Sequence, residues 1–126
     1  MFIYEAQKLL REKKITPSIL LKESIDKIEE WKRLGAFITT NIDQVLELAA
    51  KQDKILESEY DNLPTLFGIP LALKDNIYTK NLQTTAGSLF WKDFVPKQDA
   101  YVTAKMKKAG ALLVGKTNMH EIALGV

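Results

Sequence analysis

The sequence predicts an α/β fold, in which helices pack on part of a mixed sheet. Apolar residues recur at helical spacing through three stretches of the first half of the chain. Two apolar runs in the second half, 69–74 and 111–114, are too short for helices and are typical of buried strands. A helical stretch over about 101–108 joins them, which gives a βαβ crossover with parallel strands and a right-handed connection. We therefore expect one domain, with a helical scaffold over 1–60 and a βαβ region over 66–126.

Start and stop signals place the first two helices. The first is expected over about 2–13, where apolar residues fall on one face. The second begins at Thr16, an N-cap residue, with Pro17 at the first helical position. It is expected to run to about residue 33 and to stop at Gly35. The charged residues of these helices are typical of a solvated face, so we expect no chemistry there.

A short extended piece and a third helix complete the scaffold. Residues 36–40 are expected to form a small strand, and Asn41 can cap a helix over about 42–56. A polar loop over 58–66 follows. Its expected turn residues are Asp61, Asn62 and Pro64.

The first buried strand ends on charged residues. Lys74, Asp75 and Asn76 follow its apolar run without a spacer. Open α/β sheets place their chemistry at the carboxyl ends of strands, so this position favours a functional site. Physics alone leaves two interpretations of Lys74 open. Its ammonium could lie in water beside Asp75, or its amine could be desolvated, neutral for part of the time and able to act as a base.

The segment between the two strands is expected to form the surface of the site. Residues 75–98 hold no strong period, and a loop of that length inside a compact domain is usually functional. Trp91 and Phe94 are expected to pin this loop to the body of the protein.

The motif at 115–118 is expected to break the second strand. Because the two strands are expected to be parallel, this break would lie at the same sheet edge as Lys74. The motif lacks the first glycine of a phosphate-binding loop, so we expect a turn in which Lys116 faces solvent.

Composition excludes several classes of function. The formal net charge is +2, from 18 basic and 16 acidic residues, which is too small to indicate a nucleic-acid or membrane surface. The absence of cysteine excludes disulfides and thiolate metal sites and favours a reducing, cytoplasmic compartment. His120 is the single histidine, so we expect no metal site. No apolar run is long enough to cross a bilayer.

A hydrolase would need an activated hydroxyl, and the serines give weak support for one. Ser18, Ser24 and Ser58 are best interpreted as structural. Ser88 lies in a Thr-Thr-Ala-Gly-Ser turn near the Lys74 end of the strand, where hydrogen bonding within the loop is the favoured role. A small hydrolase that pairs Ser88 with Lys74 remains an alternative.

Two stretches of the chain resemble a known family. The stretch 68–88 reads GIPLALKDNIYTKNLQTTAGS, and 109–125 reads AGALLVGKTNMHEIALG. In this order they resemble the motifs of the amidase signature family. The segments KDNI and GKTNM are most similar to the branch that forms the A-subunit of the aspartyl/glutamyl-tRNA amidotransferases. The resemblance covers nearly the whole chain and implies the N-terminal portion of the amidase-signature α/β/α fold.

The resemblance assigns Lys74 as the catalytic base. In that family a serine attacks an amide carbonyl, and a second serine in a cis peptide relays its proton to the lysine. Both serines belong to a Gly/Ser-rich segment beyond the matched region, so we expect an incomplete domain that is inactive alone. The residues expected to line the substrate site are Thr84, Thr85, Ser88, Asn118 and Met119.

The resemblance also implies partners. As a glutaminase subunit, the chain would release ammonia from glutamine for the amidation of misacylated tRNA to Gln-tRNA(Gln) or Asn-tRNA(Asn). Subunits B and C would carry out that step, and ATP and Mg²⁺ are implied only for the whole complex. No cofactor is expected on this chain.

Three departures from the pattern of the amidotransferase branch keep other interpretations open. His120 stands where aspartate is usual, Val126 where serine is usual, and 86–89 is closer to general amidases. The alternatives are a part of a general amidase and a stand-alone, non-catalytic α/β binding module. The isolated chain is expected to self-associate through uncovered sheet edges at 69–74 and 111–114.

Overall fold

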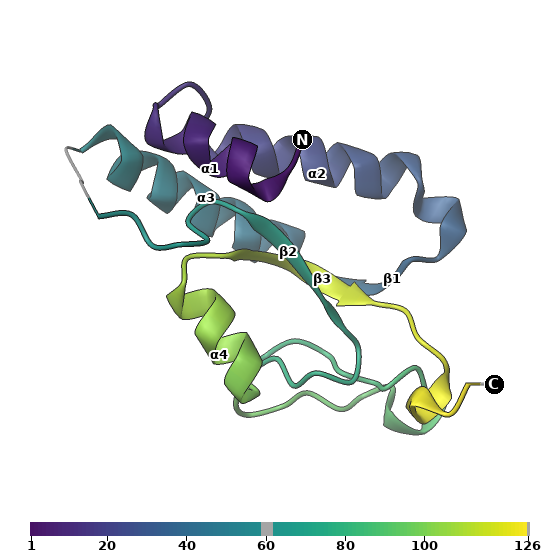
Figure 1. Ribbon diagram of the computed structural model, residues 1–126. Helices are drawn as coiled ribbons and strands as arrows, with labels where there is room; N and C mark the ends of the chain where they lie inside the picture. Colours follow the sequence, from purple (N-terminus) through teal and green to yellow (C-terminus); the bar gives the residue numbers. More distant parts are fainter. Residues whose placement is uncertain (59–61, 126) are drawn as a thin grey trace.

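The structure is a computed structural model that describes residues 1–58 and 62–125. The turn expected at Asp61 and the sequence departure at Val126 lie outside these residues. The fold is mixed α/β, as the sequence predicts (Figure 1). The helices are α1 (Ile3–Arg11), α2 (Pro17–Glu30), α3 (Ile42–Glu57) and α4 (Tyr101–Lys108), and the strands are β1 (Phe37–Thr40), β2 (Pro70–Lys74) and β3 (Leu112–Thr117).

The described strands form one mixed sheet in the order β1-β3-β2. β2 and β3 are parallel, and Lys74 lies opposite Thr117 in their register. β1 pairs with the other side of β3 in the antiparallel direction. The crossover through α4 and its parallel strands are therefore confirmed, and the carboxyl ends of β2 and β3 meet at one edge of the sheet. β3 is central, but among the described residues β1 pairs only with its residues 115–117, so the expectation of an uncovered edge at 111–114 is corrected only at Val114, whose carbonyl accepts a bond from the N–H of Asn41.

Helices lie on both sides of these strands. Figure 1 shows α1, α2 and α3 on one side, and α4 with the long loop on the other. One buried cluster joins α1, α2 and α3 to the start of β2, and a second joins α2 and α3 to β3. The second cluster consists of Leu21, Val45, Ala49, Leu112 and Val114. Burial of these side chains holds the scaffold against one face of the sheet.

The expected helix signals are largely confirmed. The side chain of Thr16 accepts a hydrogen bond from the Ile19 backbone N–H at 3.3 Å, and Pro17 is the first residue of α2. α2 itself ends earlier than expected, at Glu30, and a single 3-10 turn over Lys32–Leu34 carries the chain to Gly35. Within the described residues, none of the helices combines the length and apolarity needed to span a membrane.

The prediction that residues 115–118 break the second strand is wrong. β3 continues through Gly115 and Lys116 to Thr117. Gly115 is required there by close packing and not by a turn, because a Cβ atom would collide with the carbonyl oxygen of Thr39 and lie 3.0 Å from the Cα atom of Thr40. Lys116 is consequently buried in the sheet and does not face solvent.

The prediction that two aromatic residues pin the long loop to the core is also wrong for the described residues. Trp91 is 40% exposed and Phe94 is 38% exposed. Phe94 contacts Tyr78 from the same loop, with ring centroids 5.4 Å apart. The loop is instead held by buried polar side chains, namely Asp75, Thr79, Thr84, Thr85 and Ser88.

Candidate functional site

The candidate site lies where β2 and β3 end. The backbone N–H of Asp75 donates to the carbonyl oxygen of Thr117 at 3.1 Å, which extends the pairing of the two strands by one residue. The N–H of Ile77 then donates to the carbonyl of Lys74 at 2.9 Å and closes a turn. The direction in which the chain leaves β2 is therefore fixed at Lys74 and at the residue that follows it.

Lys74 is the last residue of β2, and its side chain is exposed. Within residues 1–58 and 62–125, its ammonium makes no hydrogen bond and no ion pair. The role of Lys74 as a base stays a prediction.

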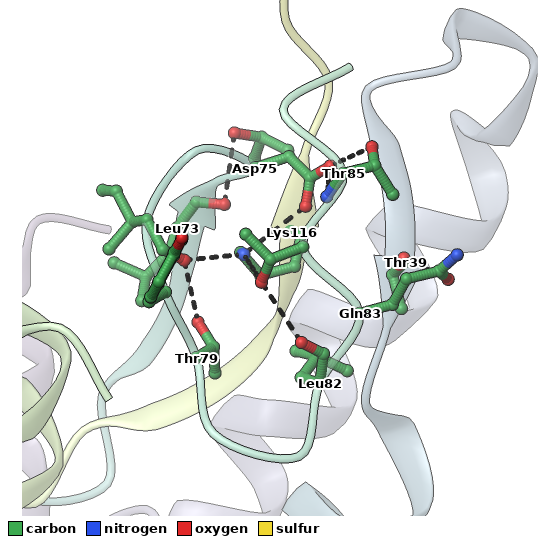
Figure 2. A network of polar contacts seen from close by, with 12 residues as sticks. Thr39, Leu73, Asp75, Thr79, Leu82, Gln83, Thr85 and Lys116 are labelled. Atoms are coloured by element: carbon green, nitrogen blue, oxygen red, sulfur yellow. Dashed lines mark hydrogen bonds and ion pairs between the residues drawn. The ribbon is translucent and has the colours of Figure 1, made fainter. Parts of the chain in front are cut away.

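The buried lysine of this site is Lys116. Its Nζ donates to the carbonyl oxygen of Ile77 at 2.7 Å and to Thr84 Oγ1 at 2.8 Å (Figure 2). It also lies 3.4 Å from Asp75 Oδ1, and both side chains are fully buried. Burial lowers the pKa of Lys116, and the neighbouring Asp75 carboxylate opposes that shift.

Asp75 ties the strand end to the following loop. Its Oδ2 accepts two hydrogen bonds from Thr85, at 2.9 Å from the backbone N–H and 2.5 Å from the hydroxyl (Figure 2). Its own carbonyl oxygen accepts a bond from the N–H of Ala86 at 3.0 Å. Oδ1 accepts no directed hydrogen bond within the described residues, so its ion pair with Lys116 is its main stabilisation. The carboxylate is thus held from both sides.

The turn after Thr85 has an unusual backbone. Ala86 and Gly87 both adopt left-handed conformations, with φ of 52° and 68°. A Cβ atom on Gly87 would lie 2.8 Å from the carbonyl oxygen of Met119, so the segment after β3 packs directly on this turn. The hydroxyl of Thr85 also accepts a bond from the N–H of Gly87 at 3.1 Å, which stabilises the bend.

Ser88 is buried and already engaged. Its hydroxyl donates to Glu121 Oε1 at 2.7 Å, and its oxygen accepts a bond from the N–H of Phe90 at 3.3 Å. Both bonds shape the loop, which agrees with the favoured interpretation of Ser88.

The predicted lining residues fall into two groups. Thr84, Thr85 and Ser88 are buried around Asp75 and Lys116. Met119 is half-buried against Gly87, whereas the exposed amide of Asn118 donates to the carbonyl of Gly35 at 3.0 Å and lies toward the entry to β1. Contact of these residues with a substrate stays a prediction.

A small cavity opens beside this loop. It has a volume of about 170 Å³ and is lined by Asn76, Tyr78, Thr84, Ala86, Trp91 and Phe94. Three aromatic side chains and one amide side chain thus surround a space of the size of a small organic group.

Sequence reasoning missed the roles of Lys116 and Asp75. Lys116 follows a glycine, a combination that is typical of an exposed turn. The available signal was the four-residue apolar run before Gly115, which is short for a strand that must pair on two sides. No local pattern could show that Lys116 would meet Asp75, because 41 positions separate them in the sequence (116 − 75).

Comparison with known proteins places this chain in a family. The family model described as Amidase matches residues 20–126. The chain belongs to the amidase family. The exposed lysine at the end of β2 and the buried network behind it are therefore features of an amidase-family chain.

Relatives in this family have different names. The chain is 45% identical over 118 residues to the A-subunit of a glutamyl-tRNA(Gln) amidotransferase of Exiguobacterium sp., covering 93% of this chain and 24% of that protein. It is 40% identical over 121 residues to a mandelamide hydrolase of Pseudomonas putida, covering 96% of this chain and 24% of that protein.

A solved structure shares the fold. The peptide amidase of Stenotrophomonas maltophilia is 34% identical and superposes with a TM-score of 0.83, over 92% of this chain and 24% of that protein. The chain thus spans about a quarter of the length of the relatives that it matches.

Proposed function

We propose that this chain supplies the proton-accepting lysine of a serine amidase, and that Lys74 is that residue. The observation that carries the proposal is the placement of Lys74. Among residues 1–58 and 62–125 its amine has no polar partner at the carboxyl end of a parallel strand, while the backbone of Lys74 and of Asp75 is fixed by hydrogen bonds. A base must be accessible to its proton donor, which the exposed side chain of Lys74 meets, and the fixed backbone at Lys74 limits where its amine can reach.

The chemistry assigned to Lys74 is proton transfer. The neutral amine takes the proton of a serine hydroxyl, directly or through a second serine, while the hydroxyl oxygen attacks the amide carbonyl. The same proton then passes to the leaving nitrogen as the C–N bond breaks. The serines would come from parts of the whole protein beyond these residues, and their approach would remove water from Lys74.

Among amidases, we favour the glutaminase subunit of a tRNA-dependent amidotransferase. Support comes from the glutamyl-tRNA(Gln) amidotransferase relative, which is 45% identical over nearly the whole chain. In that role the chain would release ammonia from glutamine in the cytoplasm, and subunits B and C would use it on misacylated tRNA. ATP and Mg²⁺ would act in the complex, with no cofactor bound by this chain.

A second candidate is an amidase for small aromatic amides. It is favoured by the cavity of about 170 Å³, whose lining includes the aromatic rings of Tyr78, Trp91 and Phe94. Such a cavity accepts an apolar ring more readily than the charged end of glutamine. The mandelamide hydrolase relative agrees with this candidate.

The test compares amide hydrolysis by the protein expressed from its complete reading frame with that of two variants. Lys74→Met is expected to lower kcat by at least about 100-fold, because general-base catalysis is lost. Lys97→Met, which removes another exposed lysine from the same long segment, is expected to leave kcat unchanged. Equal loss in both variants, or in neither, would refute the role of Lys74.

The substrate decides between the candidates in the same experiment. Turnover of glutamine but not mandelamide supports the amidotransferase role, and the reverse supports the aromatic amidase. A wild-type protein that hydrolyses no amide, with or without its partner subunits, would support the non-catalytic binding module instead.

A further inference from the structure

One member of a buried ion pair directly follows the proposed base in the chain, and the proposed function uses neither member of the pair. Lys116 and Asp75 are both fully buried, with Nζ and Oδ1 3.4 Å apart. Asp75 is the residue that follows Lys74. Burying a charge costs free energy, and a buried ion pair does not contribute to the solubility of the surface. The presence of this pair therefore needs another explanation.

The contacts of Lys116 match a charged ammonium group. The carbonyl of Ile77 and the carboxylate of Asp75 can only accept hydrogen bonds. The hydroxyl of Thr84 donates to the carbonyl of Leu82 at 3.2 Å and therefore accepts from Lys116. Two hydrogen-bond acceptors and the Asp75 carboxylate thus surround the ammonium group, and the charge of Asp75 is balanced (Figure 2).

We infer that Lys116 is a positioning residue for Lys74, which it serves by clamping and neutralising the Asp75 carboxylate. The clamp fixes the residue next to Lys74 through its side chain, in addition to its backbone bonds to Thr117 and Ala86. Neutralisation matters because an unbalanced carboxylate beside Lys74 would stabilise its ammonium form and keep the amine protonated. This inference depends on the proposed function in one respect, because the proposed function gives Lys74 its role as the base.

Two other carboxylates in the segments around this edge have partners of their own. Glu121, in the segment after β3, accepts the hydrogen bond of Ser88. Asp99, just before α4, is paired with Lys107 at 2.8 Å and accepts a bond from the N–H of Lys80. β1, the neighbour of β3 on its other side, contains no titratable residue. Asp75 is therefore the carboxylate that Lys116 acts on.

The inference is tested by measuring the titration of Lys74 directly, in the protein expressed from its complete reading frame. Competitive acetylation with acetic anhydride at a series of pH values, read by mass spectrometry of the Lys74 peptide, gives its titration midpoint without any need for activity. The variants are Lys116→Met, Asp75→Asn and the double variant. Lys107→Met is the matched control, because it breaks a different lysine–aspartate pair.

The expected shifts have opposite signs. Lys116→Met raises the midpoint of Lys74 by about one pH unit, and Asp75→Asn lowers it by a similar amount, because each leaves one charge unbalanced. The double variant is expected to have a Lys74 midpoint close to the wild-type value. Lys107→Met is expected to leave the wild-type midpoint unchanged. In active protein, the midpoint of the acid limb of the profile of kcat/KM against pH is expected to shift in the same order among the variants. A purely structural role for Lys116 would not produce shifts of opposite sign.

Two results separate this inference from the proposed function. If the titration midpoint of Lys74 is the same in wild type and in all the variants, the inference is wrong, even if Lys74→Met is inactive. A fully active Lys74→Met overturns the proposed function, while opposite shifts would still establish the electrostatic coupling. If Lys116→Met does not fold, as judged by circular dichroism, the near-isosteric Asp75→Asn decides the matter: a lowered midpoint supports the inference and an unchanged one refutes it.

Discussion

Two lysines at one sheet edge have opposite environments. Lys74 ends β2 with an exposed side chain, whereas Lys116, one position before the partner of Lys74 in the register of β3, is fully buried. The difference follows from side-chain alternation, since successive residues of a strand point to opposite faces of the sheet. At this end of the sheet the side chain of Lys74 is exposed, and that of Lys116 is covered by the loop that carries Thr84 and Thr85.

At this scale the first prediction concerns the buried pair. Lys116→Met is expected to lower the free energy of unfolding by about 3 to 5 kcal/mol, because it leaves the Asp75 carboxylate buried without its partner. The double variant Lys116→Met/Asp75→Asn is expected to lose much less, since no uncompensated charge remains. Urea denaturation of the three proteins measures both values, and equal losses in the single and double variants would contradict this account.

The second prediction concerns pH. The folded-state pKa of Lys116 lies below its ordinary value of 10.5, because burial disfavours the charged form. In the window between the lowered pKa and 10.5, the unfolded chain binds more protons than the folded chain, so stability rises with pH. Below that window the cost of burying the charge is fully present, and it is relieved as pH rises through the folded pKa.

Comparing wild type with Lys116→Met separates the titration of Lys116 from that of the other lysines, because both proteins contain all of the others. The difference in free energy of unfolding between wild type and Lys116→Met is expected to grow as pH rises through that alkaline window. Denaturation curves at several alkaline pH values measure the difference. A difference that is constant or shrinks there would contradict a lowered pKa of Lys116 in the folded protein.

At the scale of elements, the strand ends explain what could be predicted. The helix over 101–108 and the two parallel strands follow from local periodicity, which is why α4 spans the expected residues. The extension of β3 through Gly115 and Lys116 does not follow from local periodicity, because it depends on how closely β1 approaches β3. The position of Lys74 was accessible from sequence, and the partnership of Lys116 with Asp75 was not, because it forms between distant segments.

The third prediction tests that close approach. Gly115→Ala is expected to lower the free energy of unfolding by about 2 kcal/mol or more, because its Cβ would meet the backbone of Thr39 and Thr40. Gly35→Ala is the comparison: its φ is +59° but its surroundings are open, so about 1 kcal/mol is expected from backbone strain alone. Thermal denaturation ranks the two variants, and a milder effect at Gly115 would contradict the packing argument.

At the scale of the whole molecule, apolar surface remains open. β2 is an edge strand, and a groove of about 480 Å³ runs along it, bounded by side chains of α1, α2, β2 and β3. On the long loop, Leu89 is 86% exposed and Phe90 is 85% exposed. Surfaces of this kind usually meet a partner or another part of the same protein.

The fourth prediction follows from these surfaces. The 126-residue polypeptide, expressed by itself, is expected to self-associate, and Leu89→Glu/Phe90→Glu is expected to weaken the association. Lys97→Glu is the control, because it changes the net charge by the same two units without removing apolar surface. Sedimentation velocity at several concentrations measures the association. A clean monomer throughout would contradict the prediction.

The central claim, that Lys74 is the base of an amidase, is tested most directly by chemical rescue. Lys74→Ala, in the protein expressed from its complete reading frame, is assayed for amide hydrolysis with and without added propylamine. We predict a loss of at least about 100-fold in kcat and partial recovery with the amine, because a small amine can occupy the space left by the deleted side chain and act as the base. Full activity of Lys74→Ala without added amine would contradict the claim.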